Sequence, residues 1–544
     1  MPSFAAHAAR AYRFAAAMAS EIPVELEPYR DDIEAASPDS PLLTPIQTQP
    51  RWLVESSSSA TARIKRHVSS VARSVEESPW QTKFLIAILC ITVFYILTCL
   101  IRRSPLFASN LPTTTTGPYS VGAVDIEYAL KEPRRTSETV FSTTGRPAFE
   151  LETVLFTIYY PITPGTTTNV HHPWIAKPLS VTAQGYASFA HLNNFIFRPI
   201  FTFLLWIITA PVSIPAQVDA PLAPPPTAER DTFPVTIFSH GMASSKTDYT
   251  AYLSELASHG HIVAAVEHRD GSCPGTVIRQ LNQPDRILLH FKESDLGGIE
   301  TLQLKKEQLN FREAEVLETY NVLKSLHLGN GDDIHASNPL KEGACLPGFA
   351  NRLDFGNLTM AGHSYGATLA MQALANPIFR SGVILDAGKE SGRLNEDINT
   401  PILVVNSESW SSKPAIFFGK PHFSVVRNIT LKALNNTGIA WFLTSKGTAH
   451  PSVSDAPLLE PMLLSLITGS RWDTKAAIRN YANVTLEFLE HIDTGKTAGI
   501  LAEKVTHEEY GHWVSPARKS EFPKDLGYLW QVHVSPSSSS TELA

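Results

Sequence analysis

The chain contains 544 residues, of which 43% are hydrophobic and 18% charged, and its formal net charge at pH 7 is -7. This apolar fraction excludes a chain that is disordered throughout, and the length suffices for one large catalytic domain with extensions. The mildly acidic balance gives no reason to expect a nucleic acid as a partner.

Residues 1–82 predict an N-terminal region of low structural order. Residues 1–20 are rich in Ala and contain no Asp or Glu, and the residues after them are acidic and rich in Pro and Ser. The start of the chain faintly resembles an organelle transit peptide, but a short helix or a disordered tail is the simpler interpretation.

Residues 84–101 form an apolar run without a charged residue, Pro or Gly. As a helix this run would be roughly 27 Å long, close to the thickness of the hydrocarbon core of a bilayer. Helices in soluble cores are rarely apolar on every face. We therefore expect a single transmembrane anchor over residues 83–103.

The charges on either side of this run predict its orientation. Basic residues at positions 63, 65, 66, 73 and 83 precede the run, whereas only Arg102 and Arg103 follow it closely. This asymmetry favours a cytosolic N-terminus and a large domain that lies in a lumen or outside the cell. Four N-glycosylation sequons would suit that side, and they begin at Asn357, Asn428, Asn435 and Asn483.

Beyond a Thr/Pro-rich linker at residues 104–118, residues 119–490 predict one α/β domain with a mostly parallel sheet. Short apolar runs alternate there with amphipathic segments such as residues 303–326. Residues 491–544 are interpreted as a C-terminal extension with a Ser-rich tail. The expected strands include residues 235–238, 262–266, 358–361, 383–385 and 402–405.

Two cysteines of this domain, Cys273 and Cys345, show no metal-ligand spacing. They can pair as a disulfide or remain buried thiols, and the sequence leaves both alternatives open.

The pentapeptide Gly362-His-Ser-Tyr-Gly366 fits the nucleophile elbow G-x-S-x-G of α/β-hydrolases. The turn is sharp, so residues two before and two after the Ser must be small. An apolar run ends directly before it at Ala361, and a helix-forming run follows it from Ala367. We therefore predict an α/β-hydrolase fold with Ser364 as the nucleophile.

A serine nucleophile needs a histidine base and a carboxylate that orients the base, and on this fold the chain order is Ser, acid, His. Asp386 follows the expected strand at residues 383–385, where an ordinary strand-ending Asp is also possible. The pattern favours His450 only weakly, because five histidines follow Asp386: His422, His450, His491, His507 and His512.

Two backbone N–H groups should form the oxyanion hole. One belongs to Tyr365, the residue after the nucleophile. The other should come from the turn after an early strand, where Phe238-Ser-His-Gly-Met242 makes the Met242 N–H the natural donor. His240 precedes Ser364 in the chain and is interpreted as a loop-shaping residue.

Residues 196–214 form a second apolar segment, bracketed by prolines. Its densest part is too short to span a bilayer alone. One interpretation is a lid or interfacial helix that rests on lipid. The alternatives are a buried packing helix and a second membrane span.

Taken together, several stretches resemble the platelet-activating-factor acetylhydrolase family in its plasma and related intracellular form. In the family's order they cover roughly residues 117–490. The stretches are Gly117-Pro-Tyr-Ser-Val-Gly122, Tyr159-Tyr-Pro161, Phe238-Ser-His-Gly-Met242, the run LASHGHIVAAVEHRD at residues 256–270, Gly362-His-Ser-Tyr-Gly366, Leu385-Asp-Ala387, Asn406-Ser-Glu408 and Gly447-Thr-Ala-His450.

This resemblance implies that Asp386 and His450 complete a triad with Ser364, and that Met242 and Tyr365 supply the oxyanion donors. It also implies calcium-independent hydrolysis of the sn-2 ester of phospholipids with short or oxidised acyl chains, as by a 1-alkyl-2-acetylglycerophosphocholine esterase, without a metal or organic cofactor. Tyr365 stands where the family usually has Phe, and Met242 where Leu is usual, but both keep a backbone donor.

Other functions remain compatible with the same residues. A general carboxylesterase or long-chain lipase would use the same triad, and so would an enzyme that transfers the acyl group to an acceptor lipid. A catalytically dead fold kept as a membrane scaffold is less consistent with an intact Ser, Asp and His.

Overall fold

The computed structural model describes residues 79–102, 111–225, 231–471 and 473–538. The expectations for residues 1–78, for part of the linker and for the end of the Ser-rich tail lie outside these ranges. The chain divides into two units, and residues 21–106 make up the smaller one.

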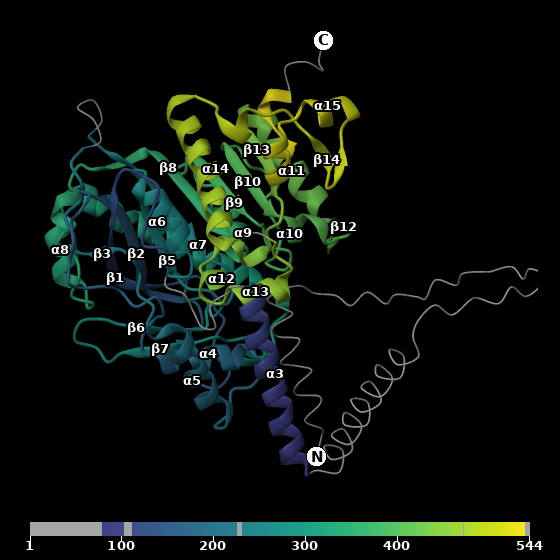
Figure 1. The fold of residues 1–544 in the computed structure, drawn as a ribbon. Helices are drawn as coiled ribbons and strands as arrows, with labels where there is room; N and C mark the ends of the chain where they lie inside the picture. The colour runs from purple at the N-terminus through teal and green to yellow at the C-terminus, as the bar shows by residue number, and fades with distance from the viewer. Residues whose placement is uncertain (1–78, 103–110, 226–230, 472, 539–544) are drawn as a thin grey trace, which may run out of the picture. The chain divides into compact units, whose positions relative to one another are not determined.

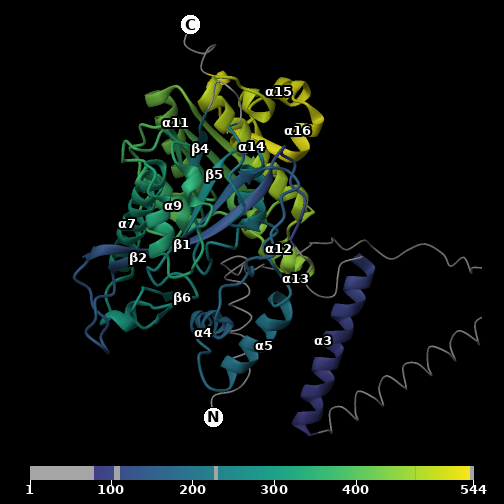
Figure 2. The ribbon, with the colours of Figure 1, turned by 90° about the vertical axis from the view of Figure 1, so that its left-hand side faces the viewer.

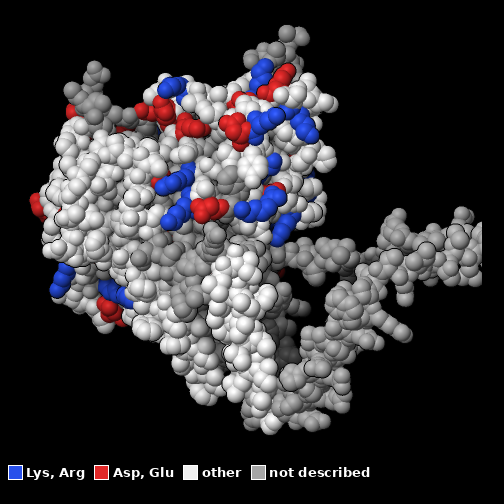
Figure 3. Space-filling model, viewed as in Figure 1, with Lys and Arg blue, Asp and Glu red and all other residues white. Residues whose placement is uncertain are grey.

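The smaller unit contains helix α3 (Trp80–Arg102, 23 residues). Its described apolar stretch forms a helix because it lacks the helix breakers Pro and Gly. The face drawn in Figure 3 shows this stretch without charged side chains. Among the described residues, no helix is both long enough and apolar enough to cross a membrane. The described part of the anchor predicted over residues 83–103 is thus helical, and its membrane span is not supported.

The larger unit is built on one sheet of ten strands in the order β16-β13-β10-β9-β8-β4-β5-β2-β1-β3. The strands from β13 to β5 are parallel, whereas β16, β2 and β1 pair antiparallel at the two sides. The strands are β1 (Ser120–Arg135), β2 (Glu150–Ile162), β3 (Gln217–Val218), β4 (Phe233–Ser239), β5 (Ile262–Glu267), β8 (Leu353–His363), β9 (Ser381–Leu385), β10 (Ile402–Ser407), β13 (Ala440–Ser445) and β16 (Trp530–Val534).

Helices cover both faces of this sheet, as Figure 1 and the side view in Figure 2 show. Side chains alternate between two apolar cores, so that Val404 joins one core while its neighbours Leu403 and Val405 join the other. The helices are α4 (Leu179–Phe189), α5 (Phe197–Thr209), α6 (Thr250–Ser258), α7 (Thr301–His327), α8 (Gly331–Ser337), α9 (Tyr365–Ala373), α10 (Glu408–Ser412), α11 (His422–Thr437), α12 (Ala456–Leu459), α13 (Pro461–Thr468), α14 (Thr474–Thr494), α15 (Pro516–Glu521) and α16 (Lys524–Leu529).

The predicted α/β architecture with a mostly parallel sheet is confirmed. Each of the five expected apolar runs lies within β4, β5, β8, β9 or β10, and the helix expected at residues 303–326 is α7. These runs are buried on both faces, which explains their continuous apolar composition. The segment after residue 490 contributes β16, which pairs with β13 and extends the sheet at one edge.

Smaller elements sit outside the sheet. The hairpin β6 (Gly275–Ile278) and β7 (Arg286–Leu289) contacts α4, and Figure 2 shows α4 beside α5. The remaining strand pairs are β11 (Ile416–Phe417) with β12 (Lys420–Pro421) and β14 (His507–Glu509) with β15 (His512–Trp513). Cys273 and Cys345 are both buried free thiols, so the disulfide alternative is not realised.

A buried ion pair ties β1 to the end of β5. Arg269 Nη2 donates to Glu127 Oε1 at 2.8 Å, and the two side chains are 2% and 0% exposed. The same carboxylate oxygen accepts hydrogen bonds from the Thr153 hydroxyl and the Arg279 N–H. Removing one partner of such a pair leaves an uncompensated charge in the interior.

We therefore expect Arg269→Met to lower the free energy of unfolding by about 3–5 kcal/mol. The double variant Arg269→Met/Glu127→Leu should recover most of that loss, because it removes the second buried charge. Urea unfolding of the wild type and both variants measures the difference. A double variant as unstable as the single one would show that lost packing, and not the unpaired carboxylate, causes the destabilisation.

Candidate active site

Ser364 lies in a sharp turn between β8 and α9. Its backbone has a φ of +57° and a ψ of -117°, a conformation that residues other than Gly rarely adopt. A Cβ on Gly362 would lie 2.1 Å from the Gly366 carbonyl oxygen, and a Cβ on Gly366 would lie 2.0 Å from that of Ser239. The two glycines are thus required by close backbone approaches, which is the reason for the G-x-S-x-G spacing.

The structure brings Ser364, His450 and Asp386 into one hydrogen-bonded chain. His450 Nε2 lies 2.9 Å from Ser364 Oγ, and His450 Nδ1 lies 2.8 Å from Asp386 Oδ2. With Nδ1–H donated to the carboxylate, Nε2 is left as the acceptor for the Ser364 hydroxyl. Of the five candidate histidines, His450 is the one that meets Ser364, from the short helix that follows β13.

Asp386 is buried and its carboxylate is held by further donors. The Ser407 N–H donates to Oδ1 at 2.6 Å, and the Ser407 hydroxyl donates to Oδ2 at 2.8 Å. These bonds come from the end of β10, the strand next to β9. They orient the carboxylate toward His450 without any contribution from Ser364.

Two aromatic neighbours of His450 were missed by the sequence analysis. Trp410 stacks on the imidazole with ring centroids 3.9 Å apart and planes at 13°, and its Nε1 donates to the Ala387 carbonyl at 2.8 Å. The His363 ring lies against the same imidazole, with the two ring centroids 4.5 Å apart. Because it is buried beside His450, the pKa of His363 falls well below its ordinary value, so His363 stays neutral.

A lysine and three possible metal-ligating side chains lie at the hydrogen-bonded chain of Ser364, His450 and Asp386. Lys389 Nζ lies 4.4 Å from the Trp410 ring centroid, and burial lowers the pKa of Lys389 to about 8. His363, Asp386 and His450 offer ligand atoms within 4.8 Å of one another. However, Asp386 Oδ2 already accepts bonds from His450 and Ser407, so the arrangement fits a proton relay better than a metal centre.

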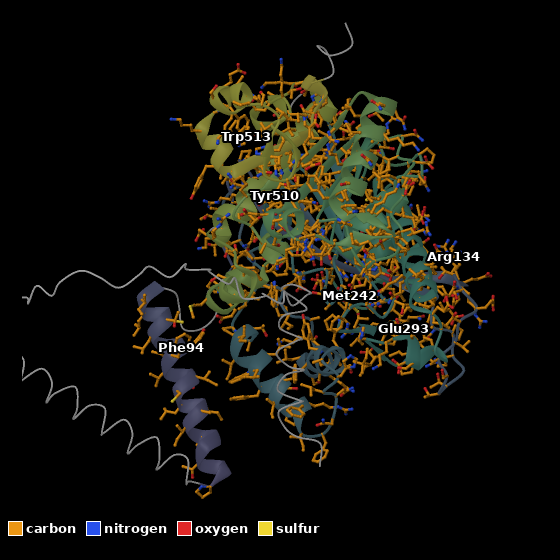
Figure 4. All side chains as sticks on the ribbon, turned by 90° about the vertical axis from the view of Figure 1, so that its right-hand side faces the viewer. Phe94, Arg134, Met242, Glu293, Tyr510 and Trp513 are labelled. Carbon is orange, nitrogen blue, oxygen red and sulfur yellow. The ribbon has the colours of Figure 1, made fainter. Side chains whose placement is uncertain are left out.

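The loop after β4 lies directly against Ser364. A Cβ on Gly241 would lie 3.1 Å from Ser364 Cβ, and Met242 follows in the same turn, where Figure 4 labels it. The His240 ring is fully buried, and its Nδ1 donates to the Gly241 carbonyl at 2.7 Å. Desolvation and the nearby Arg312 lower the pKa of His240 to about 3, so its ring remains neutral. His240 therefore shapes the loop, and Tyr365 starts helix α9 on the other side of Ser364.

A cleft of about 790 Å³ lies elsewhere, between residues 141–152, the end of α4 and the β6–β7 hairpin. None of Ser364, Asp386 and His450 lines it. The second apolar segment forms α5, with Phe203 58% and Trp206 54% exposed. This exposure contradicts the buried-packing alternative for residues 196–214, and at 13 residues α5 is too short to span a bilayer.

The family model described as "Platelet-activating factor acetylhydrolase, isoform II" matches residues 107–498. The platelet-activating factor acetylhydrolase of Cavia porcellus is 29% identical over 305 residues, which are 54% of this chain and 60% of that protein. The one of Gallus gallus is 25% identical over 356 residues, 62% of this chain and 73% of that protein. The chain thus matches less than two thirds of the length of the Cavia porcellus relative.

Among solved structures, a ferulic acid esterase from Streptomyces cinnamoneus is similar to this chain. The TM-score is 0.47 and the sequence identity 18%, over 73% of this chain and 97% of that one.

The Trp410 stack generates a prediction for the reactivity of Ser364. Trp410→Leu should slow the labelling of Ser364 by a fluorophosphonate about tenfold, because a flat aromatic face both aligns His450 and attracts its protonated form. Trp410→Phe keeps a ring but loses the bond to the Ala387 carbonyl, so a smaller loss is expected. The labelling rate measures both variants. Wild-type rates in Trp410→Leu would show that the stack does not influence the base.

Proposed function

The chain belongs to the platelet-activating factor acetylhydrolase isoform II family, and on this premise we propose that it is a serine hydrolase of lipid esters. In finer detail, we propose that it cleaves the sn-2 ester of phospholipids with a short or oxidised acyl chain, and that it does so without calcium. The observation that carries the proposal is the hydrogen-bonded chain from Ser364 Oγ through His450 to Asp386.

In the proposed mechanism, His450 Nε2 takes the proton of the Ser364 hydroxyl while Oγ attacks the ester carbonyl carbon. Asp386 stabilises the imidazolium that forms. The N–H groups of Met242 and Tyr365 donate to the oxyanion of the tetrahedral intermediate. When that intermediate collapses, the ester C–O bond breaks and His450 returns the proton to the departing lysophospholipid oxygen.

The second half of the reaction reverses these proton transfers. A water molecule gives a proton to His450 and attacks the acyl carbon, and the bond to Ser364 Oγ breaks. The carboxylic acid leaves and Ser364 recovers its proton. Each step uses side chains and backbone N–H groups of the protein together with water, so the proposed reaction requires no metal ion.

The exposed apolar face of helix α5 supports the proposal that the protein binds its substrate at a lipid surface. Its exposed apolar side chains include Ile200, Phe203, Leu204 and Trp206, each 45% exposed or more. Exposing such an apolar patch to water is unfavourable, and burying it in a lipid interface lowers the free energy.

On the face shown in Figure 3, charged side chains of both signs are interspersed over the C-terminal part, a distribution that does not favour nucleic acid. Placement in a lumen or outside the cell remains a prediction.

The decisive experiment compares the wild type with Ser364→Ala, both as the full chain and in chelator. Each is assayed on a phosphatidylcholine with an acetyl sn-2 chain and on one with a long sn-2 chain. We expect acetate release by the wild type, a loss of about 10³-fold or more in the variant, and weak turnover of the long chain. Equal or better hydrolysis of the long chain would instead indicate a general lipase.

Two other outcomes would contradict the proposal. Turnover that depends on Ser364 but yields an acylated acceptor lipid in place of free acetate would identify a transacylase. No turnover of either lipid, together with no fluorophosphonate labelling of Ser364, would favour a scaffold.

The interfacial role of α5 has its own test. Phe203→Ser/Trp206→Ser should weaken binding to phosphatidylcholine vesicles at least tenfold, because about 1.5–3 kcal/mol is gained for each large apolar side chain that is fully buried. Ile416→Ser is the matched control, since Ile416 is 74% exposed in β11, outside α5. Vesicle sedimentation measures binding. Equal binding of both variants would exclude α5 as the lipid contact.

A further inference from the structure

A buried arginine on α7, Arg312, contacts both the loop after β4 and the start of α9. Its side chain is fully buried, and its guanidinium makes three hydrogen bonds. Nε donates to Asp270 Oδ2 at 2.8 Å, Nη1 to the His240 carbonyl at 2.8 Å and Nη2 to Ser272 Oγ at 2.5 Å. The guanidinium carbon also lies 4.4 Å from the centroid of the Tyr365 ring. One side chain therefore touches the residues on both sides of the proposed oxyanion hole.

The first contact determines how the loop after β4 is oriented. In a trans peptide the C=O and N–H groups point in opposite directions. Arg312 holds the His240 carbonyl, and the N–H of the same peptide, on Gly241, donates to the Tyr249 hydroxyl at 3.2 Å. In the next peptide the Gly241 carbonyl accepts from His240 Nδ1, so the Met242 N–H must point away from the His240 ring.

The second contact involves the residue after the nucleophile. The Tyr365 ring packs against the Arg312 guanidinium, and its hydroxyl donates to Gln308 Oε1 at 2.8 Å. Gln308 Nε2 in turn donates to the Asp270 carbonyl at 3.0 Å. Helix α7 thus holds the start of α9 and the β4 loop through one connected network.

The end of β4 and the start of α9 lie so close together that neither backbone segment can shift far. A Cβ on Gly366 would lie 2.0 Å from the Ser239 carbonyl oxygen and 2.8 Å from that of His240. The end of β4 and the start of α9 are therefore in direct backbone contact. Although burial alone would raise it, Arg312 and Ser272 lower the pKa of Asp270 below its ordinary value, which keeps the ion pair charged.

We propose that Arg312 is a positioning residue that holds the Met242 and Tyr365 N–H groups at the separation a tetrahedral oxyanion requires. This inference rests on the proposed function and deepens it. Donors in an oxyanion hole act only when they are fixed before the charge develops, since reorganisation during the reaction costs free energy. A buried planar guanidinium with three directed bonds provides that fixation, whereas an ammonium at the same position has no fork of donors.

The test compares Arg312→Lys, which keeps the charge but loses the fork, with Arg269→Lys as the matched control. Arg269 is also buried and paired with a carboxylate, Glu127, but its side chain is not hydrogen-bonded to the β4 loop. Turnover of the acetyl phospholipid is expressed per reactive Ser364, counted by complete fluorophosphonate labelling, so that loss of folded protein does not lower the value.

We expect Arg312→Lys to lower kcat per site about 10²-fold with KM changed less than about threefold, because an oxyanion donor acts mainly in the transition state. Affinity for a trifluoromethyl ketone, whose adduct with Ser364 carries an oxyanion, should fall in parallel with kcat/KM. Arg269→Lys should keep the kcat per site of the wild type.

Wild-type kcat per site in Arg312→Lys, or an equal fall in Arg269→Lys, would overturn the inference. If Arg312→Lys does not fold, Asp270→Asn serves instead. It has the same shape but leaves the guanidinium without its counter-charge, and a fall in kcat of about tenfold at unchanged KM is expected. Unchanged kcat in Asp270→Asn would likewise overturn the inference. Equal turnover by the wild type and Ser364→Ala would contradict the proposed function itself. The two failures are therefore distinguishable.

Discussion

Ser364 is held with a φ of +57°, and a residue in such a conformation raises the free energy of the folded state by about 1–3 kcal/mol. The surrounding structure must offset this strain. The Ser364 N–H donates to the Leu385 carbonyl at the end of β9, and the Ser364 carbonyl accepts from the Ala367 N–H in α9. With Gly362 and Gly366 allowing close backbone contact, the strained turn is held between two strands and a helix. The hydroxyl is thereby kept outside the sheet, where a base can reach it.

The parallel arrangement explains why the partners of Ser364 come from distant parts of the chain. The carboxyl ends of parallel strands meet at one edge of a sheet. Asp386 follows β9 and His450 follows β13, and β10 lies between these two strands. The end of β10 and the start of α10 brace both partners, since Ser407 binds Asp386 and the Ser409 hydroxyl accepts from the His450 N–H at 3.0 Å. Trp410, from the same segment, stacks on the imidazole. One continuous segment, the end of β10 with α10, thus orients two of the three hydrogen-bonded side chains.

Two buried ion pairs fix backbone segments elsewhere in the larger unit, and only the pair of Arg312 reaches the β4 loop. Arg312 and Asp270 form a fully buried pair beneath the β4 loop, and Arg269 and Glu127 form another between β5 and β1. Buried ion pairs add little net stability when compared with well-packed apolar side chains. Their value here is directional, because a guanidinium specifies the positions of several oxygen atoms at once. The residues 256–270, which carried the family resemblance, end in this network.

By itself, the sequence determined the features that depend on local physics. The parallel strands were predictable because their apolar runs are buried on both faces, and Ser364 was predictable as a candidate because its turn requires glycines at fixed spacing. The helix at residues 80–102 was predictable from its composition, although the membrane span was not supported. Only the tertiary structure selected His450 among five histidines by geometry and brought Trp410 and Arg312 to the site. Those contacts join segments far apart in the chain, and no local pattern encodes a distance between two strands.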